Sequence, residues 1–418
     1  MAKILVAVSG LKGILFSSFG VLRRLEGDGH RVLLGSAKNV NEWTDANEIP
    51  FLQLPDIFLQ HSLLQKIYRR ILSILSEPRA LETRIKDLKV DEIADIFEAE
   101  QFDLLLCDVE MHEFVLAAHK AKIKTILLSQ WFNLAENHQV PVIQSLLNPE
   151  DKTDFSTDWA ELKVNKRKSE KSIISRKKAL LKKAKQLNFP TEYWQHHTWP
   201  PPFVYVNFPT ISLTIEQLDF YPKEDYFDYI GPTIHENRKS PESKEFPIKQ
   251  FLSKKENGSK IILVTVSTLK TASVEFIELF SKIAKEHSDW EIILNSTSEQ
   301  LEKPENLHLF EFIPQLEILK IADLSINHGG IHTINECIHF RVPMIIISGD
   351  KHDQNGCAAR CFYHGIAMET NSGSLESCIN DCINNGSQKN SVQHFHQHYL
   401  EYLESKRLEE IVNQYLLN

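Results

Sequence analysis

Short apolar runs alternate with helical stretches along most of the chain, and this alternation limits the fold more than any other feature. Residues 3–8 are apolar, residues 15–25 have helical spacing, and residues 31–35 start a second apolar run. Apolar runs at 102–107 and 124–129 continue the pattern. Apolar strands that alternate with helices predict a parallel sheet, covered by helices on both faces and joined by right-handed crossovers.

The same pattern restarts after a polar interruption. Residues 221–257 are rich in Pro, Lys, Glu and Ser, which indicates a linker. A second α/β series follows, with apolar runs at 261–266, 290–294, 307–310, 324–327 and 344–347. We therefore predict an α/β protein with two doubly wound, Rossmann-like domains. Ligands of such domains bind beside the carboxyl ends of the strands, so the two domains are expected to face a common cleft.

The length of 418 residues also fits two domains better than a single core. The predicted division is a first domain at 1–225 with an insertion at 141–202, a linker at 226–257, a second domain at 258–390 and a C-terminal helix at 391–418. The final helix can pack on either domain.

Composition and charge exclude several classes of protein. The net charge of −9 argues against nucleic acid as the main partner, because phosphate binding requires a basic surface. No apolar run reaches the roughly 20 residues that a membrane span requires, and residues 1–10 lack the order of a signal peptide. The six cysteines form no Cys-x-x-Cys pair, which predicts reduced thiols and no metal site. We expect a cytoplasmic protein.

One stretch departs from the acidic balance. Residues 163–185 contain eleven Lys or Arg residues and the single acid Glu170. Isoleucines and leucines are interleaved with these cations. The stretch therefore predicts either a basic amphipathic helix at the inner face of an anionic membrane or a solvated helix within the insertion, and both interpretations stay open.

The motif that carries chemistry lies at residues 326–336, which read Ile-Asn-His-Gly-Gly-Ile-His-Thr-Ile-Asn-Glu. An apolar strand ends, Gly329 and Gly330 form a tight turn, and a helix begins. The free N–H groups and the positive dipole end of a helix start can hold a diphosphate. His328 and Thr333 add donors to it, and Glu336 can accept hydrogen bonds from both hydroxyls of a ribose.

The surrounding segments follow a specific order: Phe-Ile-Pro-Gln at 312–315, Val-Pro at 342–343 and Asp-Gln at 353–354. With this order the chain resembles the UDP-glycosyltransferase superfamily (family 1, GT-B fold), and within it bacterial MGT-like and zeaxanthin-glucosyltransferase-like members. The resemblance implies an inverting enzyme that moves a hexose from a UDP- or dTDP-sugar to a small, hydrophobic or phenolic acceptor. Such enzymes serve natural-product or glycolipid biosynthesis, and the nucleotide sugar is a donor substrate rather than a cofactor.

The resemblance also assigns roles to residues at matching positions. Those for the donor are Phe312 and Ile313 at the base; Gln315 and Glu336 at the ribose; His328, Gly329, Gly330 and Thr333 at the diphosphate; Asp353 and Gln354 at the sugar hydroxyls. Ser267 and Lys270 belong to the loop that opens the second domain, where Lys270 can supply a cation to the phosphates. This loop departs from the family because Leu269 replaces a glycine, and His332 stands where relatives have Asn.

The largest departure concerns the general base. Relatives carry Gly-His in the first loop, whereas this chain has Gly13-Ile14, and isoleucine cannot accept a proton. The candidate substitutes follow an apolar strand: Asp108 matches a family Asp that orients the base, and His112 ordinarily titrates near neutral pH. Glu110 can replace His112 if it is desolvated. The plain alternative is that these residues cap a helix with an acidic first turn.

Two other functions also fit the sequence. Ile14, Leu269 and His332 motivate a nucleotide-sugar-binding partner protein that has lost transfer activity. A nucleotide-sugar epimerase of the same fold would need no acceptor pocket, and the long insertion at 141–202 argues against it. Residues 130–133 and 193–202 are aromatic segments that can line an acceptor pocket.

Overall fold

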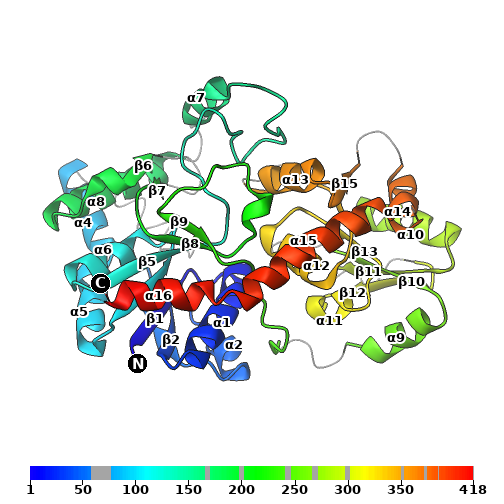
Figure 1. Cartoon of the computed structure of the whole chain (residues 1–418), viewed down its shortest axis with the longest axis horizontal. Coiled ribbons are helices and arrows are strands. Elements are labelled where there is room, and N and C mark those ends of the chain that lie inside the picture. The colour runs from blue at the N-terminus through cyan, green and yellow to red at the C-terminus, as the bar shows by residue number, and fades with distance from the viewer. Residues whose placement is uncertain are drawn as a thin grey trace.

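The chain forms two α/β halves that lie side by side, each built on its own parallel sheet (Figure 1). The structure is a computed structural model, and it describes residues 1–57, 77–164, 170–196, 202–240, 246–265, 272–296, 302–349, 353–370, 374–384 and 386–417.

The N-terminal half contains a seven-stranded sheet in the order β3-β2-β1-β4-β5-β8-β9, with every neighbouring pair parallel. Its strands are β1 (Lys3–Val8), β2 (Arg31–Ser36), β3 (Phe51–Gln53), β4 (Leu104–Asp108), β5 (Lys124–Ser129), β8 (Thr210–Ser212) and β9 (Phe227–Tyr229). Nearly every residue of β1 and β4 is buried, as expected of strands that helices cover on both faces.

Seven described helices belong to this half: α1 (Lys12–Gly27), α2 (Asn41–Ala46), α4 (Glu77–Asp87), α5 (Val90–Glu100), α6 (His112–Lys120), α7 (Ser156–Val164) and α8 (Glu170–Gln186). Helix α1 shows why they form. Leu15, Phe19 and Leu22 recur at helical spacing and are buried against the sheet. The helix ends where Gly29 takes a positive φ of 87°, a conformation that glycine adopts without strain.

The C-terminal half contains a six-stranded parallel sheet in the order β12-β11-β10-β13-β14-β15. Its strands are β10 (Lys260–Val264), β11 (Trp290–Asn295), β12 (Leu307–Phe310), β13 (Leu324–Asn327), β14 (Met344–Ile346) and β15 (Ala367–Glu369), and its helices are α9 (Ile248–Glu256), α10 (Val274–Glu286), α11 (Gln315–Leu319), α12 (Ile331–Phe340), α13 (Gln354–Tyr363) and α14 (Leu375–Asn384).

Both sheets reverse their strand order at one point, between β1 and β4 in the first and between β10 and β13 in the second. Ligands of doubly wound sheets bind outside the carboxyl ends of the strands at this switch point. Asp108 ends β4, and residues 328–330 follow β13. The two segments that the sequence singled out therefore lie at the two switch points, and the prediction of two doubly wound domains is confirmed.

The stretch expected as a linker, residues 226–257, contains regular structure. It includes β9 at the edge of the first sheet and α9 in the second half. Between them the chain packs on α1: Thr233 Oγ1 donates to the carbonyl of Ser17 at 2.7 Å, and a Cβ on Gly20 would lie 2.3 Å from the carbonyl oxygen of Thr233. The first sheet thus extends a few residues into the expected linker.

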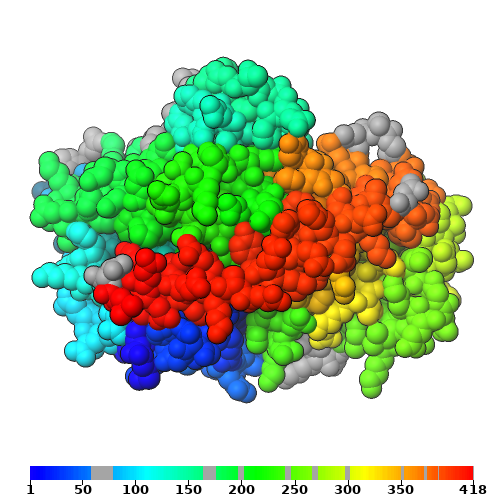
Figure 2. All heavy atoms as spheres, viewed as in Figure 1, coloured from blue at the N-terminus to red at the C-terminus, as the bar shows by residue number. Residues whose placement is uncertain are grey.

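The C-terminal segment forms two helices, α15 (Ser387–Glu404) and α16 (Arg407–Leu417), with Lys406 at a φ of 45° between them. Helix α15 packs on α12 of the second half, whereas Leu408 and Val412 of α16 are buried in the core beside α1. In Figure 2 these residues form a continuous red band across both halves. The segment therefore packs on both halves and ties them together.

The insertion places α7, η1 (Thr191–Tyr193) and the antiparallel pair β6 (Trp194–His196) and β7 (Phe203–Tyr205) on the N-terminal half. In α8, Ala179, Leu180 and Ala184 are fully buried in that half, and Lys183 pairs with Asp91 at 2.6 Å. The described apolar face of α8 thus contacts protein, which favours the interpretation as a surface helix of the insertion over the membrane-bound one. No helix in the described ranges is long and apolar enough to cross a membrane.

Candidate active site

The turn between β13 and α12 has the geometry of an anion site. Gly329 has a φ of 82°, and its N–H donates to Asn327 Oδ1 at 2.9 Å. A Cβ on Gly329 would lie 3.0 Å from Ile346 Cγ2 and 3.1 Å from the Gln354 carbonyl oxygen, so only glycine fits. Among the described residues no side chain caps the start of α12. Its first N–H groups therefore remain available to a bound anion.

The two residues expected at the ribose lie together. Gln315 Nε2 donates to Glu336 Oε2 and lies 3.4 Å from Thr333 Oγ1. Glu336 is 5% exposed, and Ile313, just before the α11 segment, is also buried. Phe312 beside it is half-buried. Gln315, Thr333 and Glu336 thus form one hydrogen-bonded group at the start of α11 and on the first two turns of α12.

Arg238, a cation that the sequence did not predict here, pairs with this hydrogen-bonded group. Arg238 Nη1 lies 2.8 Å from Glu336 Oε1, and its guanidinium lies over the Phe16 ring at 4.5 Å. Arg238 comes from the stretch between the two sheets, and no motif of the sequence pointed to it. It joins the ribose carboxylate candidate of the second half to helix α1 of the first.

These residues line a cavity between α1 and α12. The lining residues are Gly13, Phe16, Ser17, Leu213, Pro232, Thr233, Ile234, Arg238, His332, Asn335 and Glu336. The cavity measures about 40 Å³, which is room for a few water molecules. Pockets for drug-sized ligands measure roughly 300 Å³ or more, so a nucleotide sugar requires lining groups to move.

His332, which replaces the asparagine of relatives, contacts the first half. A Cβ on Gly13 would lie 2.8 Å from its Cδ2. Burial and, second, the nearby Arg238 lower the pKa of His332 to about 4. Ile14, the residue after Gly13, stands in place of the family's histidine and is buried in the apolar core of the first half. An imidazole is therefore present close to the position where relatives carry one, but it belongs to the other domain.

The pair expected at the sugar hydroxyls faces the first half. Trp131 Nε1 donates to Asp353 Oδ2 at 3.0 Å across the cleft. A Cβ on Gly349 would lie 3.0 Å from Gln354 Oε1, so the side chain of Gln354 lies close to the chain that follows β14. His328 Nε2 would lie 2.9 Å from a Cβ on Gly330, which places the ring over the turn. The donor-site candidates from residue 312 to 354 thus surround the start of α12.

The acidic candidates for the base lie at the end of β4. Asp108 is fully buried, and burial raises its pKa to about 6, although hydrogen bonds from Glu110 and Ser9 oppose the shift. Burial raises the pKa of Glu110 to about 8; the carboxylates of Asp108 and Asp353 contribute, and Arg176 opposes them. Because Asp353 belongs to the other half, Glu110 lies near the expected sugar. A carboxyl group that titrates near neutral pH is suited to general-base catalysis.

His112 has a different environment. Its ring is fully buried, its Nδ1 lies 2.9 Å from the Tyr205 hydroxyl, and the rings of Trp194, Phe203 and Tyr205 enclose it. Burial lowers its pKa well below the usual value. Helix α6 begins at His112, and the ring packs against the β6–β7 hairpin. The structure therefore brings Asp108 and Glu110 toward the donor side but leaves His112 in the core.

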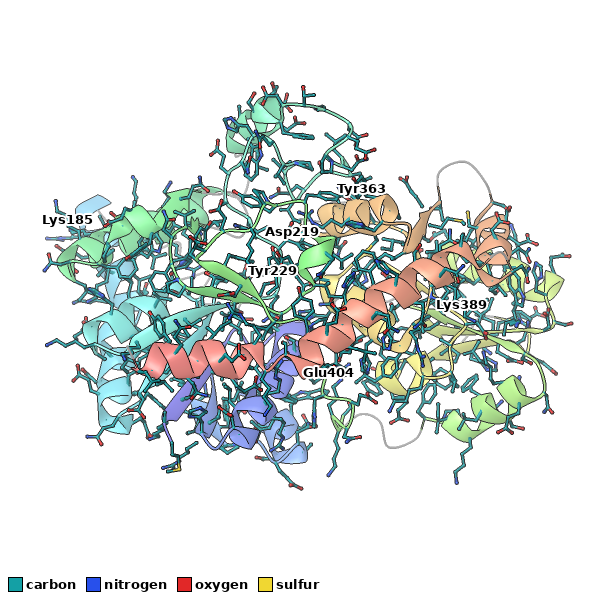
Figure 3. The ribbon with its side chains drawn as sticks, viewed as in Figure 1. Lys185, Asp219, Tyr229, Tyr363, Lys389 and Glu404 are labelled. Carbon is teal, nitrogen blue, oxygen red and sulfur yellow. The ribbon has the colours of Figure 1, made fainter. Side chains whose placement is uncertain are left out.

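Helix α13, which follows Asp353, is fixed to the first half by contacts that sequence reasoning missed. Arg360 pairs with Asp219 at 2.7 Å, and both side chains are at least 97% buried. The Arg360 guanidinium also lies over Phe132 at 4.2 Å. The N–H of Gly356 donates to the carbonyl of Ile143 at 2.8 Å. Figure 3 shows Asp219 in the middle of the molecule, between the two sheets.

Ser267, Leu269 and Lys270 lie outside the described residues, so the phosphate role expected of Ser267 and Lys270 remains a prediction. The described ranges contain no group of three or more His, Cys, Asp or Glu side chains that could hold a metal ion. All six cysteines are free and buried.

Comparison with known proteins agrees with this architecture. Residues 269–368 match the model of the glycosyltransferase family 28 C-terminal domain. Among solved structures, the glycotransferase of kitacinnamycin superposes with a TM-score of 0.70 at 17% identity, covering 99% of this chain and 98% of that one. The calicheamicin glycosyltransferase CalG4 gives 0.66 at 15% identity, covering 100% and 98%. The fold is therefore GT-B, the two-domain fold of nucleotide-sugar-dependent glycosyltransferases.

Curated relatives with similar sequences are named as glucosyltransferases. The Bacillus subtilis uncharacterized UDP-glucosyltransferase YdhE is 27% identical over 212 residues, which is 47% of this chain and 51% of YdhE. The zeaxanthin glucosyltransferase of Pantoea ananas is 28% identical over 165 residues, 37% of this chain and 36% of that protein. The match thus spans about half the length of YdhE. With the matched domain, these relatives show that the chain is similar to members of the UDP-glycosyltransferase superfamily.

Proposed function

We propose that this protein is an inverting glycosyltransferase that moves a hexose from a UDP- or dTDP-sugar to a hydroxyl of a small, hydrophobic or phenolic acceptor. The observation that carries the proposal is the grouping of Gln315, Thr333 and Glu336 beside an uncapped helix start at the switch point of the second sheet. Glu336 and Gln315 can bond the hydroxyls of a ribose, and the helix start with Thr333 can hold the adjoining diphosphate. Related proteins named UDP-glucosyltransferase and zeaxanthin glucosyltransferase support the donor and the acceptor class.

In the proposed reaction Glu110 is the general base and Asp108 holds it in place. The acceptor proton moves to the Glu110 carboxylate while the acceptor oxygen attacks the anomeric carbon. The bond from that carbon to the diphosphate breaks, and the nucleoside diphosphate leaves with the electron pair. The helix start after Gly330, together with Thr333 and His328, stabilises the leaving group without a metal or a further cofactor. Asp353 and Gln354 hold the sugar during the transfer.

The proposal places the reaction in the cytoplasm, because free, buried cysteines suit a reducing compartment. The acceptor is expected between the two halves. Trp131 supports this site because it follows β5 and contacts Asp353, so an acceptor beside it would lie next to the transferred sugar. A bound acceptor hydroxyl there would also lie on the side of Glu110.

The test combines nucleotide binding with transfer. The wild-type chain is expected to bind UDP or dTDP and to transfer sugar to members of a panel of phenolic and hydrophobic acceptors. Glu336→Ala removes the carboxylate that accepts from the ribose, and two lost charge-assisted hydrogen bonds weaken nucleotide binding by about 100-fold. Isothermal titration calorimetry measures this change.

The control is Glu317→Ala, which removes an exposed glutamate from α11, close in sequence to Gln315. It should leave nucleotide affinity unchanged. Intact UDP and dTDP binding by Glu336→Ala would overturn the assignment of the ribose site.

A binding protein without transfer activity is the second candidate, favoured by the burial of Ile14, which leaves the first loop without a proton acceptor at that position. The two functions differ in one measurement. A transferase consumes donor in the presence of an acceptor, whereas the binding protein retains nucleotide affinity and releases no UDP across the whole panel.

A further inference from the structure

Arg238 is held in place from both halves of the molecule. The backbone of its neighbour Lys239 exchanges two hydrogen bonds with the Asn47 side chain: Lys239 N–H donates at 2.7 Å and the Lys239 carbonyl accepts at 2.9 Å. Asn47 is 5% exposed. These two hydrogen bonds fix the chain beside α2. The Arg238 guanidinium extends from there over Phe16 to Glu336.

Both charged side chains of the pair are largely buried. The side chain of Arg238 is 16% exposed and that of Glu336 is 7% exposed. A buried carboxylate without a cation beside it is costly, so the arginine stabilises the charge of Glu336. Gln315 occupies Oε2 and Arg238 occupies Oε1, so both oxygens that a ribose diol would use already have partners.

A nucleotide sugar must displace part of this arrangement, because the cavity of about 40 Å³ is too small for it. Most of the other lining side chains are short, or belong to α1 and α12. Arg238 has the longest side chain of the lining set, and within that set it is the one Lys or Arg. Its fixed backbone lets the guanidinium move by rotation of its own side chain while its origin stays beside the cavity.

We propose that Arg238 is a diphosphate-binding residue that exchanges partners when the donor enters: Glu336 passes from the guanidinium to the ribose hydroxyls, and the guanidinium pairs with the diphosphate. This inference rests on the proposed function, because it requires Glu336 to bind ribose. The exchange replaces one buried ion pair by another. A planar guanidinium suits phosphate oxygens because it donates two parallel hydrogen bonds.

The exchange predicts opposite effects on nucleotides and nucleosides. Arg238→Ala removes the diphosphate's cation and is expected to weaken UDP binding by about 10-fold. Uridine has no phosphate and gains from an unoccupied Glu336, so it should bind the variant at least as tightly as the wild type. Calorimetric titration of the full chain with UDP, dTDP, uridine and thymidine measures both effects. Arg238→Lys, which retains the charge, should recover part of the UDP affinity.

Two further variants keep the test decisive. Arg238→Gln removes the charge but can still donate to Glu336, and it gives the same comparison if the alanine variant does not fold. Arg407→Ala removes a partly exposed arginine of α16 that pairs with Asp228 of β9, and it should change neither affinity. Equal affinities of wild type and Arg238→Ala for UDP, or tighter binding of UDP by the variant, would overturn the inference alone. Wild-type chain that binds neither UDP nor dTDP would overturn the proposed function.

Discussion

On the C-terminal side of the cleft, the donor-site candidates come from one stretch of chain, and Gln315 bonds a partner only 21 residues away. On the N-terminal side, the properties of Glu110 depend on distant segments: Arg176 comes from the insertion and Asp353 from the other half. The donor side uses hydrogen bonds and a helix start, which act locally. The base side uses burial and opposing charges, which depend on how the whole chain packs.

This difference explains why the family's donor motif persists in the chain while its base does not. A local turn needs its own glycines and polar side chains, and replacing them removes the site. A proton acceptor needs only a carboxyl or an imidazole whose pKa lies near the working pH. Several positions around a buried cleft can satisfy that requirement, so the base can move from the first loop, where Ile14 now stands, to the end of β4.

The largest effect is expected at the base. Glu110→Gln should lower kcat by about 1000-fold, because general-base catalysis typically contributes 10²–10⁴-fold. The carboxyl accepts a proton only when ionised, and its pKa is raised to about 8. The wild-type rate should therefore rise with pH up to about pH 8 and then level, and this limb should be absent from the residual rate of the variant. Transfer assays from pH 5.5 to 9.5 measure it.

Nucleotide binding separates this result from a general loss of structure. The variant should bind UDP as tightly as the wild type, since Glu110 does not line the expected nucleotide site. Glu98→Gln, an exposed change on α5, is the matched control and should leave kcat unchanged. A Glu110→Gln rate within threefold of the wild type would exclude Glu110 as the base.

The fold could be predicted because the periodicity of apolar residues is a local property. Strands such as β1 and β13 are short, continuous apolar runs, and the helices between them have an apolar face. The boundaries of some elements were harder to predict. β9 lies in a polar stretch and forms only because the edge of the first sheet accepts it. The break between α15 and α16 at Lys406 depends on the path of the chain from one half to the other.

The arrangement of the candidate site residues could be predicted where they lie at fixed spacing in one element. Thr333 and Glu336 lie on one face of α12, so their cooperation follows from the sequence. Arg238 stands in a stretch with no periodicity, and its contact with Glu336 depends on the position of the linker. The direction of His112 depends on the start of α6 and on the hairpin that covers it. The closeness of His112 to Asp108 and Glu110 in the sequence therefore did not predict that its ring packs against the hairpin.

A smaller effect is expected where α13 joins the two sides. Gly356 is helical and would gain helix propensity as alanine, but its Cβ would lie 2.3 Å from the Ile143 carbonyl oxygen. This overlap with backbone requires α13 to move, so Gly356→Ala should lower the free energy of unfolding by about 2 kcal/mol. Gly27→Ala is the control, because a Cβ there meets nothing within 4 Å. Equal stability of the two variants in urea denaturation would contradict this prediction, because it would show that the backbone at Ile143 moves at little cost.

The smallest effect is expected at His112, whose replacement tests whether the base side includes an imidazole. His112→Phe fills the space between Trp194 and Phe203 with a ring of similar shape. It removes the hydrogen bond between His112 Nδ1 and the buried Tyr205 hydroxyl, which costs about 1–3 kcal/mol. It also removes His112 Nε2, a buried nitrogen with no hydrogen-bond partner in the described part of the chain, and that gain offsets much of the cost. The free energy of unfolding should therefore change by about 1 kcal/mol, and kcat should stay within twofold of the wild type. A hundredfold loss of kcat with intact UDP affinity would instead assign the proton to His112, and the cleft would then have to open to the β6–β7 hairpin during the reaction.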